Sequence, residues 1–83
     1  MKIWAKLMDG DRICSDTVFE DKSAATYDRF CGWVAEICKT LDCSTPILLP
    51  LHFSRFTDFK NVRFKPDDFV DSLGHDSLVI EQF

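Results

Sequence analysis

Glycine and proline are scarce in this chain of 83 residues, which contains three of each. The glycines, Gly10, Gly32 and Gly74, lie far apart, so the chain has no glycine-rich loop that cradles a phosphate group. No serine lies in the nucleophile-elbow pattern of the α/β-hydrolases. The chain therefore lacks the sequence motifs of nucleotide-binding loops and of this hydrolase class.

Long apolar runs are also missing. The longest is Ile47 to Leu49, which resumes at Leu51 after a proline, whereas a helix that spans a bilayer needs about 20 apolar residues. The first residues mix lysine with apolar side chains and lack the apolar core and the cleavage site of a secretory signal. We therefore expect a cytoplasmic protein with no membrane partner, whose four cysteines are reduced.

The chain has no Cys-x-x-Cys pair, the strongest sequence signal of a zinc site. Cys38, Cys43, His52 and His75 offer donor atoms of the types that bind zinc. Cys31 and Cys38 fall on the apolar stripe of a predicted helix, where free cysteine behaves as a small hydrophobic residue. We expect no metal and no cofactor.

Catalytic arrangements are equally weak. Cys43 with His52 or His75 is the least implausible nucleophile pair. Asp42, which precedes Cys43, is acidic, whereas a reactive thiol needs electropositive surroundings. The sequence therefore predicts no enzyme and no catalytic residue.

Three carboxylates, Asp67, Asp68 and Asp71, follow Pro66. Such a group can bind Mg²⁺ or divide acid–base roles. Acidic residues in the first turn after a proline also stabilise the positive end of a short helix. We favour this structural interpretation.

Positive charge is in deficit, with 10 Lys and Arg against 14 Asp and Glu and a net charge of −4. Because affinity for phosphate backbones is mostly electrostatic, this balance disfavours general nucleic-acid binding. One stretch, Phe53 to Phe69, is an exception, because its five phenylalanines are interleaved with Arg55, Lys60, Arg63 and Lys65. Either these cations bind phosphates while a phenylalanine stacks on a base, or the phenylalanines form the core and the cations are solvated.

The N-terminal residues predict a β-hairpin. In residues 2–8 one set of side chains, all apolar, alternates with a second set that contains two lysines, as in a strand with one buried face. The dipeptide Asp9-Gly10 is preferred in two-residue type I′ turns, and residues 12–19 supply the returning strand. The buried side of the first strand is expected to carry Ile3, Ala5 and Leu7.

A long amphipathic helix is predicted next, from Tyr27 to Leu41, because apolar residues recur there with helical spacing. Asp21 or Ser23 is expected to cap its N-terminus. The apolar stripe contains Tyr27, Phe30, Cys31, Val34, Ile37, Cys38 and Leu41.

The second half of the chain predicts shorter elements. Pro46 and Pro50 favour an extended segment between them, and Pro50 also suits the first position of a short helix. Strands are expected at residues 61–64 and 77–83, and a single helical turn at residues 66–70. The inward face of the short helix is expected to carry Leu51, Phe53, Phe56 and Phe59.

This order of elements predicts an α+β fold in a single domain, residues 1–83. A small, largely antiparallel sheet, made of the N-terminal hairpin and the C-terminal strands, is expected to pack on one long amphipathic helix. The face of the sheet away from this helix would carry Lys2, Trp4, Lys6 and Met8. Either these residues contact a partner, since aromatic side chains often dominate interfaces, or Phe83 or another C-terminal residue covers Trp4.

Three segments of the chain carry a resemblance to a known family: Lys-Ile-Trp-Ala-Lys-Leu-Met-Asp-Gly-Asp-Arg-Ile at the N-terminus, Ile-Cys-Lys-Thr-Leu-Asp-Cys-Ser-Thr-Pro-Ile-Leu-Leu in the middle, and Val-Arg-Phe-Lys-Pro-Asp-Asp-Phe-Val before Ser-Leu-Val-Ile-Glu. In this order they resemble a family of short stand-alone proteins from Firmicutes-type bacteria. The resemblance implies a bacterial, cytoplasmic, single-domain protein. It implies no activity, cofactor or catalytic residue.

The sequence as a whole therefore predicts a non-enzymatic protein-interaction module, which binds another protein or itself through a face or edge of its sheet. Lys2, Trp4, Lys6 and Met8 are the expected contact residues. The acidic residues from Asp67 onward suggest a sharper version, an inhibitor or adaptor encoded by a mobile element that docks onto a basic partner. The alternative is a small nucleic-acid-binding protein that uses Arg55, Lys60, Arg63 and Lys65.

Overall fold

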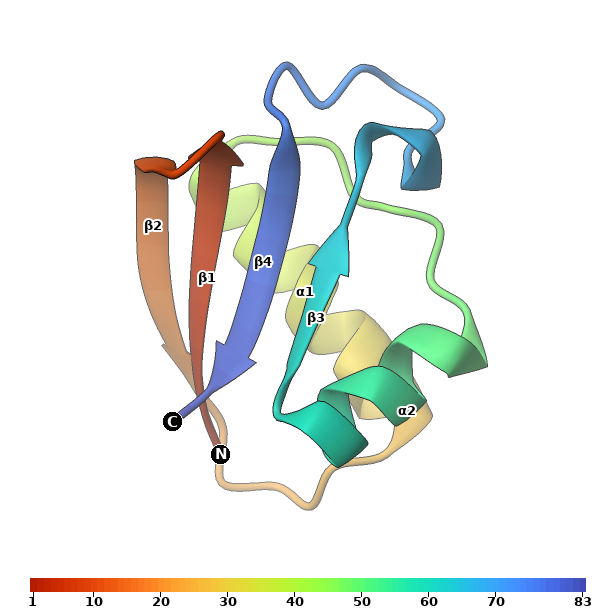
Figure 1. Ribbon diagram of the computed structural model, residues 1–83. Helices are drawn as coiled ribbons and strands as arrows, with labels where there is room; N and C mark the ends of the chain where they lie inside the picture. Colours follow the sequence, from red (N-terminus) through yellow and green to blue (C-terminus); the bar gives the residue numbers. More distant parts are fainter.

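The protein has an α+β fold, in which two helices cover one face of a four-stranded antiparallel sheet (Figure 1). We describe it from a computed structural model of residues 1–83. The strands are β1 (Lys2–Asp9), β2 (Arg12–Glu20), β3 (Asn61–Phe64) and β4 (Ser77–Gln82). The helices are α1 (Tyr27–Leu41) and α2 (Pro50–Phe59), and a short 3-10 turn, η1, spans Pro66–Asp68.

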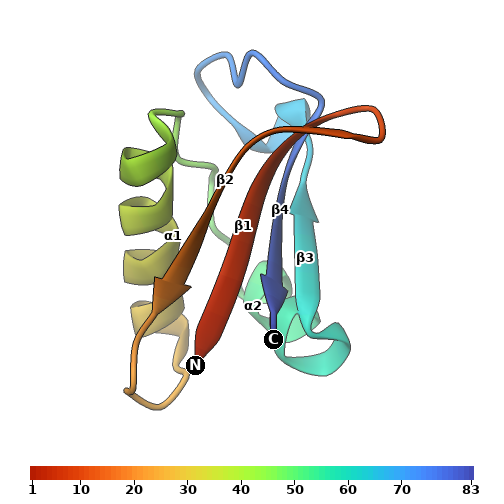
Figure 2. The ribbon, with the colours of Figure 1, turned by 90° about the vertical axis from the view of Figure 1, so that its left-hand side faces the viewer.

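The strand order is β2-β1-β4-β3, so the N-terminal strand lies in the middle of the sheet beside the C-terminal one. This confirms the predicted fold class, with one difference: two helices cover the sheet rather than one. Figure 2 shows α1 to one side of the strands, with α2 behind β4 and β3 in this view, and α2 joins the same core through His52, whose ring lies 4.8 Å from that of Phe64. Neither helix is long and apolar enough to cross a membrane.

The β1–β2 hairpin was predicted correctly, but its turn is one residue later than expected. Asp9 pairs with Arg12, so the two turn residues are Gly10 and Asp11. Of these two, only Gly10 has a positive φ, of 61°. A type II′ turn requires glycine at its first central position, and this explains why Gly10 occupies that position.

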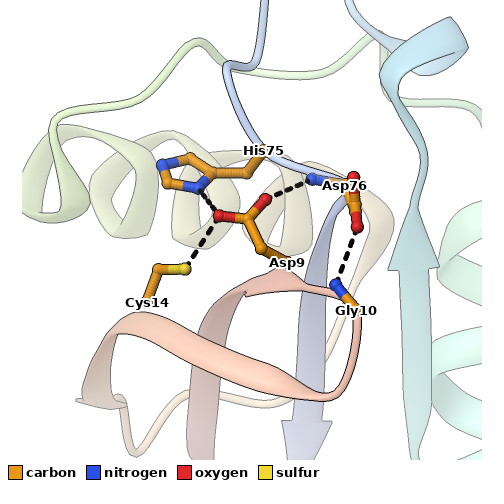
Figure 3. Close-up of polar contacts among 5 residues, drawn as sticks. All are labelled: Asp9, Gly10, Cys14, His75 and Asp76. Carbon is orange, nitrogen blue, oxygen red and sulfur yellow. Dashed lines mark hydrogen bonds and ion pairs between the residues drawn. The ribbon is translucent and has the colours of Figure 1, made fainter.

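A β-bulge interrupts the hairpin near its turn. Leu7 pairs with Ser15 while Met8 pairs with Ile13, so Cys14 is an extra residue without a partner on β1. Bulges bend a strand and redirect a side chain. Here the redirected side chain is the thiol of Cys14, which points toward Asp9 (Figure 3).

Helix α1 has the predicted bounds, but its cap is neither Asp21 nor Ser23. The N-cap is Thr26, whose hydroxyl accepts a hydrogen bond from the backbone N–H of Arg29 at 3.2 Å. The carboxylate of Asp21 instead accepts from the Ser23 backbone and from the indole N–H of Trp33, at 2.6 and 3.1 Å. Trp33 lies outside the predicted stripe but is buried, because this hydrogen bond satisfies its polar edge.

Helix α2 begins at Pro50, as predicted for the alternative with a helix, but it rests on a different face. Leu51 and Phe59 are 53% and 70% exposed, whereas His52 and Phe56 are buried. Residues four apart share a helix face, while a spacing of three drifts by about 60° per step. The spacing of three from Phe53 to Phe59 therefore turns the last phenylalanine away from the core.

One hydrophobic core lies between the helices and the sheet. Phe30 of α1 and Phe56 of α2 meet there with ring centroids 5.1 Å apart. The buried strand residues of β1 are Ile3, Ala5 and Leu7, as predicted. Phe69 and Leu73 anchor the long loop before β4 to the same cluster.

Candidate functional site

The face of the sheet away from the helices carries a row of side chains on the central strand β1. Pairing places Trp4 between Val18 of β2 and Glu81 of β4. The predicted contact residues on this face are Lys2, which is exposed, and Trp4, Lys6 and Met8, which are half-buried. They alternate along β1 with Ile3, Ala5 and Leu7, which are buried in the core against the helices.

Trp4 is held in one position by its neighbours on this face. Its indole N–H donates to the carboxylate of Asp16 on β2 at 2.8 Å. The ammonium group of Lys6 lies 4.1 Å from the centre of the Trp4 ring and 3.5 Å from the carboxylate of Glu81. The side chain therefore has a fixed orientation before any partner binds, which reduces the entropy lost on binding.

The alternative prediction for Trp4, a second small core closed by a C-terminal residue, is wrong. Phe83 follows β4 and is 65% exposed. Trp4 itself belongs to no buried cluster. Phe83 therefore does not cover Trp4, whose half-buried ring stays partly accessible beside Lys6.

Strand β2, of nine residues, forms one edge of the sheet and pairs only with β1, so no strand lies along its outer side. Most of its side chains are exposed, including the apolar Ile13 and Val18, at 42% and 58%. Such a strand presents a row of backbone N–H and C=O groups that can pair with another chain. The opposite edge, β3, has only four residues.

The four cations of the alternative nucleic-acid patch do not form one continuous groove. Arg63 and Lys65 line a common hollow of about 330 Å³ together with Gly10. Arg55 lies on α2 and Lys60 follows it as the C-cap, in the layer that covers the other side of the sheet. The structure therefore separates the four cations into two pairs, Arg63 with Lys65 and Arg55 with Lys60.

The phenylalanines among these cations lie mostly inside. Phe56, Phe64 and Phe69 are buried, and Phe53 packs partly against the core. Phe59, 70% exposed, is the exception. The interpretation in which these rings form the core is correct for four of the five.

A second cluster, which the sequence analysis did not predict, lies at the hairpin turn (Figure 3). The Oδ2 atom of Asp9 is 2.8 Å from the Cys14 thiol and 3.0 Å from Nδ1 of His75. These three donor atoms all lie within 4.8 Å of one another. Asp9 ends β1, Cys14 is the bulged residue of β2, and His75 comes from the loop before β4.

Backbone hydrogen bonds connect this loop to the hairpin. The N–H of Asp76 donates to the carbonyl of Met8 at 2.9 Å and to Oδ1 of Asp9 at 3.1 Å. The side chain of Asp76 accepts from the N–H of Gly10 at 2.7 Å. Asp9 and His75 also line an open hollow of about 410 Å³ that the loop borders.

The charges in the cluster follow from these contacts. The hydrogen bond from the Cys14 thiol, with a second from His75, lowers the pKa of Asp9 below its ordinary value. The same hydrogen bond to Asp9 raises the pKa of the Cys14 thiol. Because the carboxylate lies between the thiol and the imidazole, no thiolate–imidazole pair forms, and the cluster is not arranged as a nucleophile activated by a histidine base.

The nucleophile pair considered from the sequence is not assembled either. His52 lies on the buried face of α2, where its Nδ1 accepts from the backbone N–H of Leu49 at 3.0 Å. A hydrogen bond from the Cys38 thiol, and secondarily the charge of His75, lowers the pKa of Cys43. His75 directs its Nδ1 to Asp9 instead.

The three carboxylates after Pro66 diverge. Asp68 accepts from the backbone N–H of Lys65 at 2.9 Å, which caps the short η1 turn. Asp67 and Asp71 border different hollows. The structural interpretation is confirmed for Asp68, whose carboxylate caps the short turn.

No protein-family model, curated protein or solved structure matches this chain. The resemblance to short bacterial proteins stays a prediction.

Proposed function

We propose that the protein is a non-enzymatic interaction module that binds an extended, basic segment of another protein along the β2 edge. The main support for this proposal is the position of Trp4. Its side chain is held on the sheet face away from the core, on the strand next to β2, and β2 has no pairing partner on its outer side. Through such a contact the protein would act as an inhibitor or adaptor, by occlusion or scaffolding.

The β2 edge supports strand addition as the mode of binding. Backbone pairing along an exposed edge supplies affinity, and neighbouring side chains supply specificity. A strand added beside β2 would lie next to Val18, which is 58% exposed and pairs with Trp4. Trp4 and Val18 are therefore the expected apolar anchors of the interface.

The charge around β2 favours a basic partner. Exposed acids on the hairpin and strand include Asp11, Asp16 and Glu20, against Arg12 as the cation of β2. The loop before β4, at the same end as the hairpin turn in Figure 1, adds Asp71 and Asp76. A second copy of this chain, with the same net charge of −4, is disfavoured by this surplus.

The first experiment recovers the partner and then measures its affinity. The tagged protein is incubated with a nuclease-treated bacterial lysate, and the recovered protein is purified and titrated against variants. Trp4→Ala is expected to weaken binding at least about 30-fold, as loss of an interface hot spot of about 2 kcal/mol does. Val18→Lys is expected to do the same, because it places a cation where a basic segment would pack.

The matched control is Leu51→Lys, which adds the same charge at a side chain of similar exposure, 53%, on helix α2. It is expected to leave the affinity unchanged. Equal binding by wild type, Trp4→Ala and Val18→Lys would contradict the proposal. Recovery of nucleic acid in untreated lysate, reduced by Arg63→Gln and Lys65→Gln, would favour the nucleic-acid alternative instead.

A further inference from the structure

The cluster at the hairpin turn combines three side chains of the types that ligate transition metals. Carboxylate oxygen, thiol sulfur and imidazole nitrogen lie within 4.8 Å of one another. We propose that Asp9, Cys14 and His75 bind a divalent transition-metal ion, Zn²⁺ in the first place, through Oδ2, Sγ and Nδ1. This site is independent of the proposed protein-binding function.

The geometry fits a zinc site after a small adjustment. Zinc bonds of about 2.0–2.3 Å in a tetrahedral arrangement place the ligand atoms roughly 3.3–3.7 Å apart. Oδ2 of Asp9 is now 2.8 Å from Sγ of Cys14 and 3.0 Å from Nδ1 of His75. An ion would spread these two distances by less than an ångström and would draw Sγ of Cys14 and Nδ1 of His75, which lie within 4.8 Å of each other, to a similar separation.

The ion would replace the proton that the Cys14 thiol donates to Asp9. Metal ligands must be deprotonated, so the thiol proton leaves to solvent as the metal–sulfur bond forms, and the proton on Nδ1 of His75 is replaced by one on Nε2, which leaves the imidazole neutral. One proton is therefore released for each ion bound. No oxidant or reductant is needed.

The surroundings hold the ligands in place. The backbone N–H of Asp76 binds Oδ1 of Asp9, so the carboxylate keeps Oδ2 directed at the cluster. The β-bulge directs Cys14 toward the same point. Such supporting contacts orient the ligands of metal sites and raise their affinity.

The donor set and its access select the class of ion. A thiolate and an imidazole favour Zn²⁺ and related ions over Mg²⁺ and Ca²⁺, which prefer oxygen alone. Three protein ligands leave a fourth position, and Asp9 and His75 border an open hollow of about 410 Å³. Three ligands with an open position are typical of zinc sites that exchange a water or bind a further ligand.

A second set of donors is the main competitor. The thiols of Cys38 and Cys43 lie close together at the end of α1, and Cys43 is near enough to His75 to be affected by its charge. Cys38, however, is completely buried. The test must therefore separate Cys14 from Cys43.

The experiment is a titration of the reduced, full-length protein with Zn²⁺ by calorimetry, and with Co²⁺ by absorption. We expect one ion per chain, a thiolate-to-cobalt charge-transfer band, and release of one proton, measured in buffers of different ionisation enthalpy. Cys14→Ser and His75→Gln are expected to weaken Zn²⁺ at least about 100-fold, since loss of supporting residues alone costs about 10–100-fold. Cys43→Ser and Cys31→Ser are the controls, and both should bind like wild type.

Circular dichroism of each variant establishes that it folds. Because Cys14 is exposed, its substitution is expected to change the stability of the fold little. No binding by the folded wild type, or binding that Cys43→Ser abolishes and Cys14→Ser does not, would overturn the proposal. Equal affinity for Mg²⁺ and Zn²⁺ would also overturn it, because the thiol would then take no part. A Co²⁺ charge-transfer band lost only in Cys14→Ser and His75→Gln supports it.

Discussion

The two faces of the sheet are made by the same strands but have opposite roles. On the helix side, Ala5 and Ile80 are paired and fully buried. On the other side, Trp4 and Lys6 make polar contacts at the surface. Alternation along a strand thus lets one set of residues stabilise the fold while the next is free for binding.

The sharpest way to test this division compares neighbours in β4. Ile80 is completely buried, whereas the adjacent Val79 points to the open face and is half-buried. Ile80→Ala is expected to lower the free energy of unfolding by about 2–5 kcal/mol, because it removes apolar contacts and leaves a cavity. Val79→Ala is expected to cost about 1 kcal/mol or less, the typical effect of a point substitution outside the core.

Urea denaturation of the two variants measures both effects. Equal losses of stability would mean that the open face also contributes a core. In that case the face around Val79 would be a poor candidate for a docking surface.

A smaller effect is expected from the contact that orients Trp4. Asp16→Ala removes the acceptor of the indole N–H and should cost about 0.5–1.5 kcal/mol, as loss of an exposed hydrogen bond does. Partner affinity should fall as well, because the ring loses its fixed orientation. Ser15→Ala, at the adjacent exposed position of β2, is the control and should change neither quantity.

The core on the helix side also contains the imidazole ring of His52. The pH dependence of the stability tests how well this site tolerates a charge. Burial, reinforced by the charge of Arg55, lowers the pKa of His52 below its ordinary value of 6.5. The unfolded chain therefore binds a proton more readily than the folded one as the pH falls below about 6.5, and stability decreases there. Above that pH the ring is neutral in both states and the contribution is constant.

His52→Asn isolates this contribution, because its amide oxygen can replace Nδ1 as the acceptor for the Leu49 N–H. Free energies of unfolding measured between pH 7.5 and 5 should then vary less with pH than those of wild type. An unchanged pH profile would show that His52 is not the group that titrates.

The sequence predicted most of the fold because the deciding signals are local. The apolar spacing in α1 and the alternation in β1 and β4 fixed these elements to within a residue. The errors also have local causes. Thr26 rather than Asp21 caps α1, since Asp21 is occupied by Trp33, and Gly10 rather than Asp9 opens the turn.

The candidate sites were predicted less well. Trp4 was placed on the open face by alternation alone, whereas the cluster of Asp9, Cys14 and His75 left no signal in the sequence. Asp9 and His75 are 66 positions apart and meet because Asp76 fastens the loop to the hairpin. Cys14 reaches them through a bulge, which interrupts alternation and cannot be derived from it.

The smallest expected effect concerns the ion pair between Lys6 and Glu81 on the open face, 3.5 Å apart. The Glu81 carboxylate is 40% exposed, so water screens the attraction, and such pairs contribute about 0–1 kcal/mol. A double-mutant cycle with Lys6→Met and Glu81→Gln should therefore give a coupling energy below about 1 kcal/mol that decreases with added salt. A larger coupling that persists in high salt would mean that Lys6 is rigidly held for the fold. A weak one means that its ammonium group, above the Trp4 ring, is available to a partner at little cost in stability.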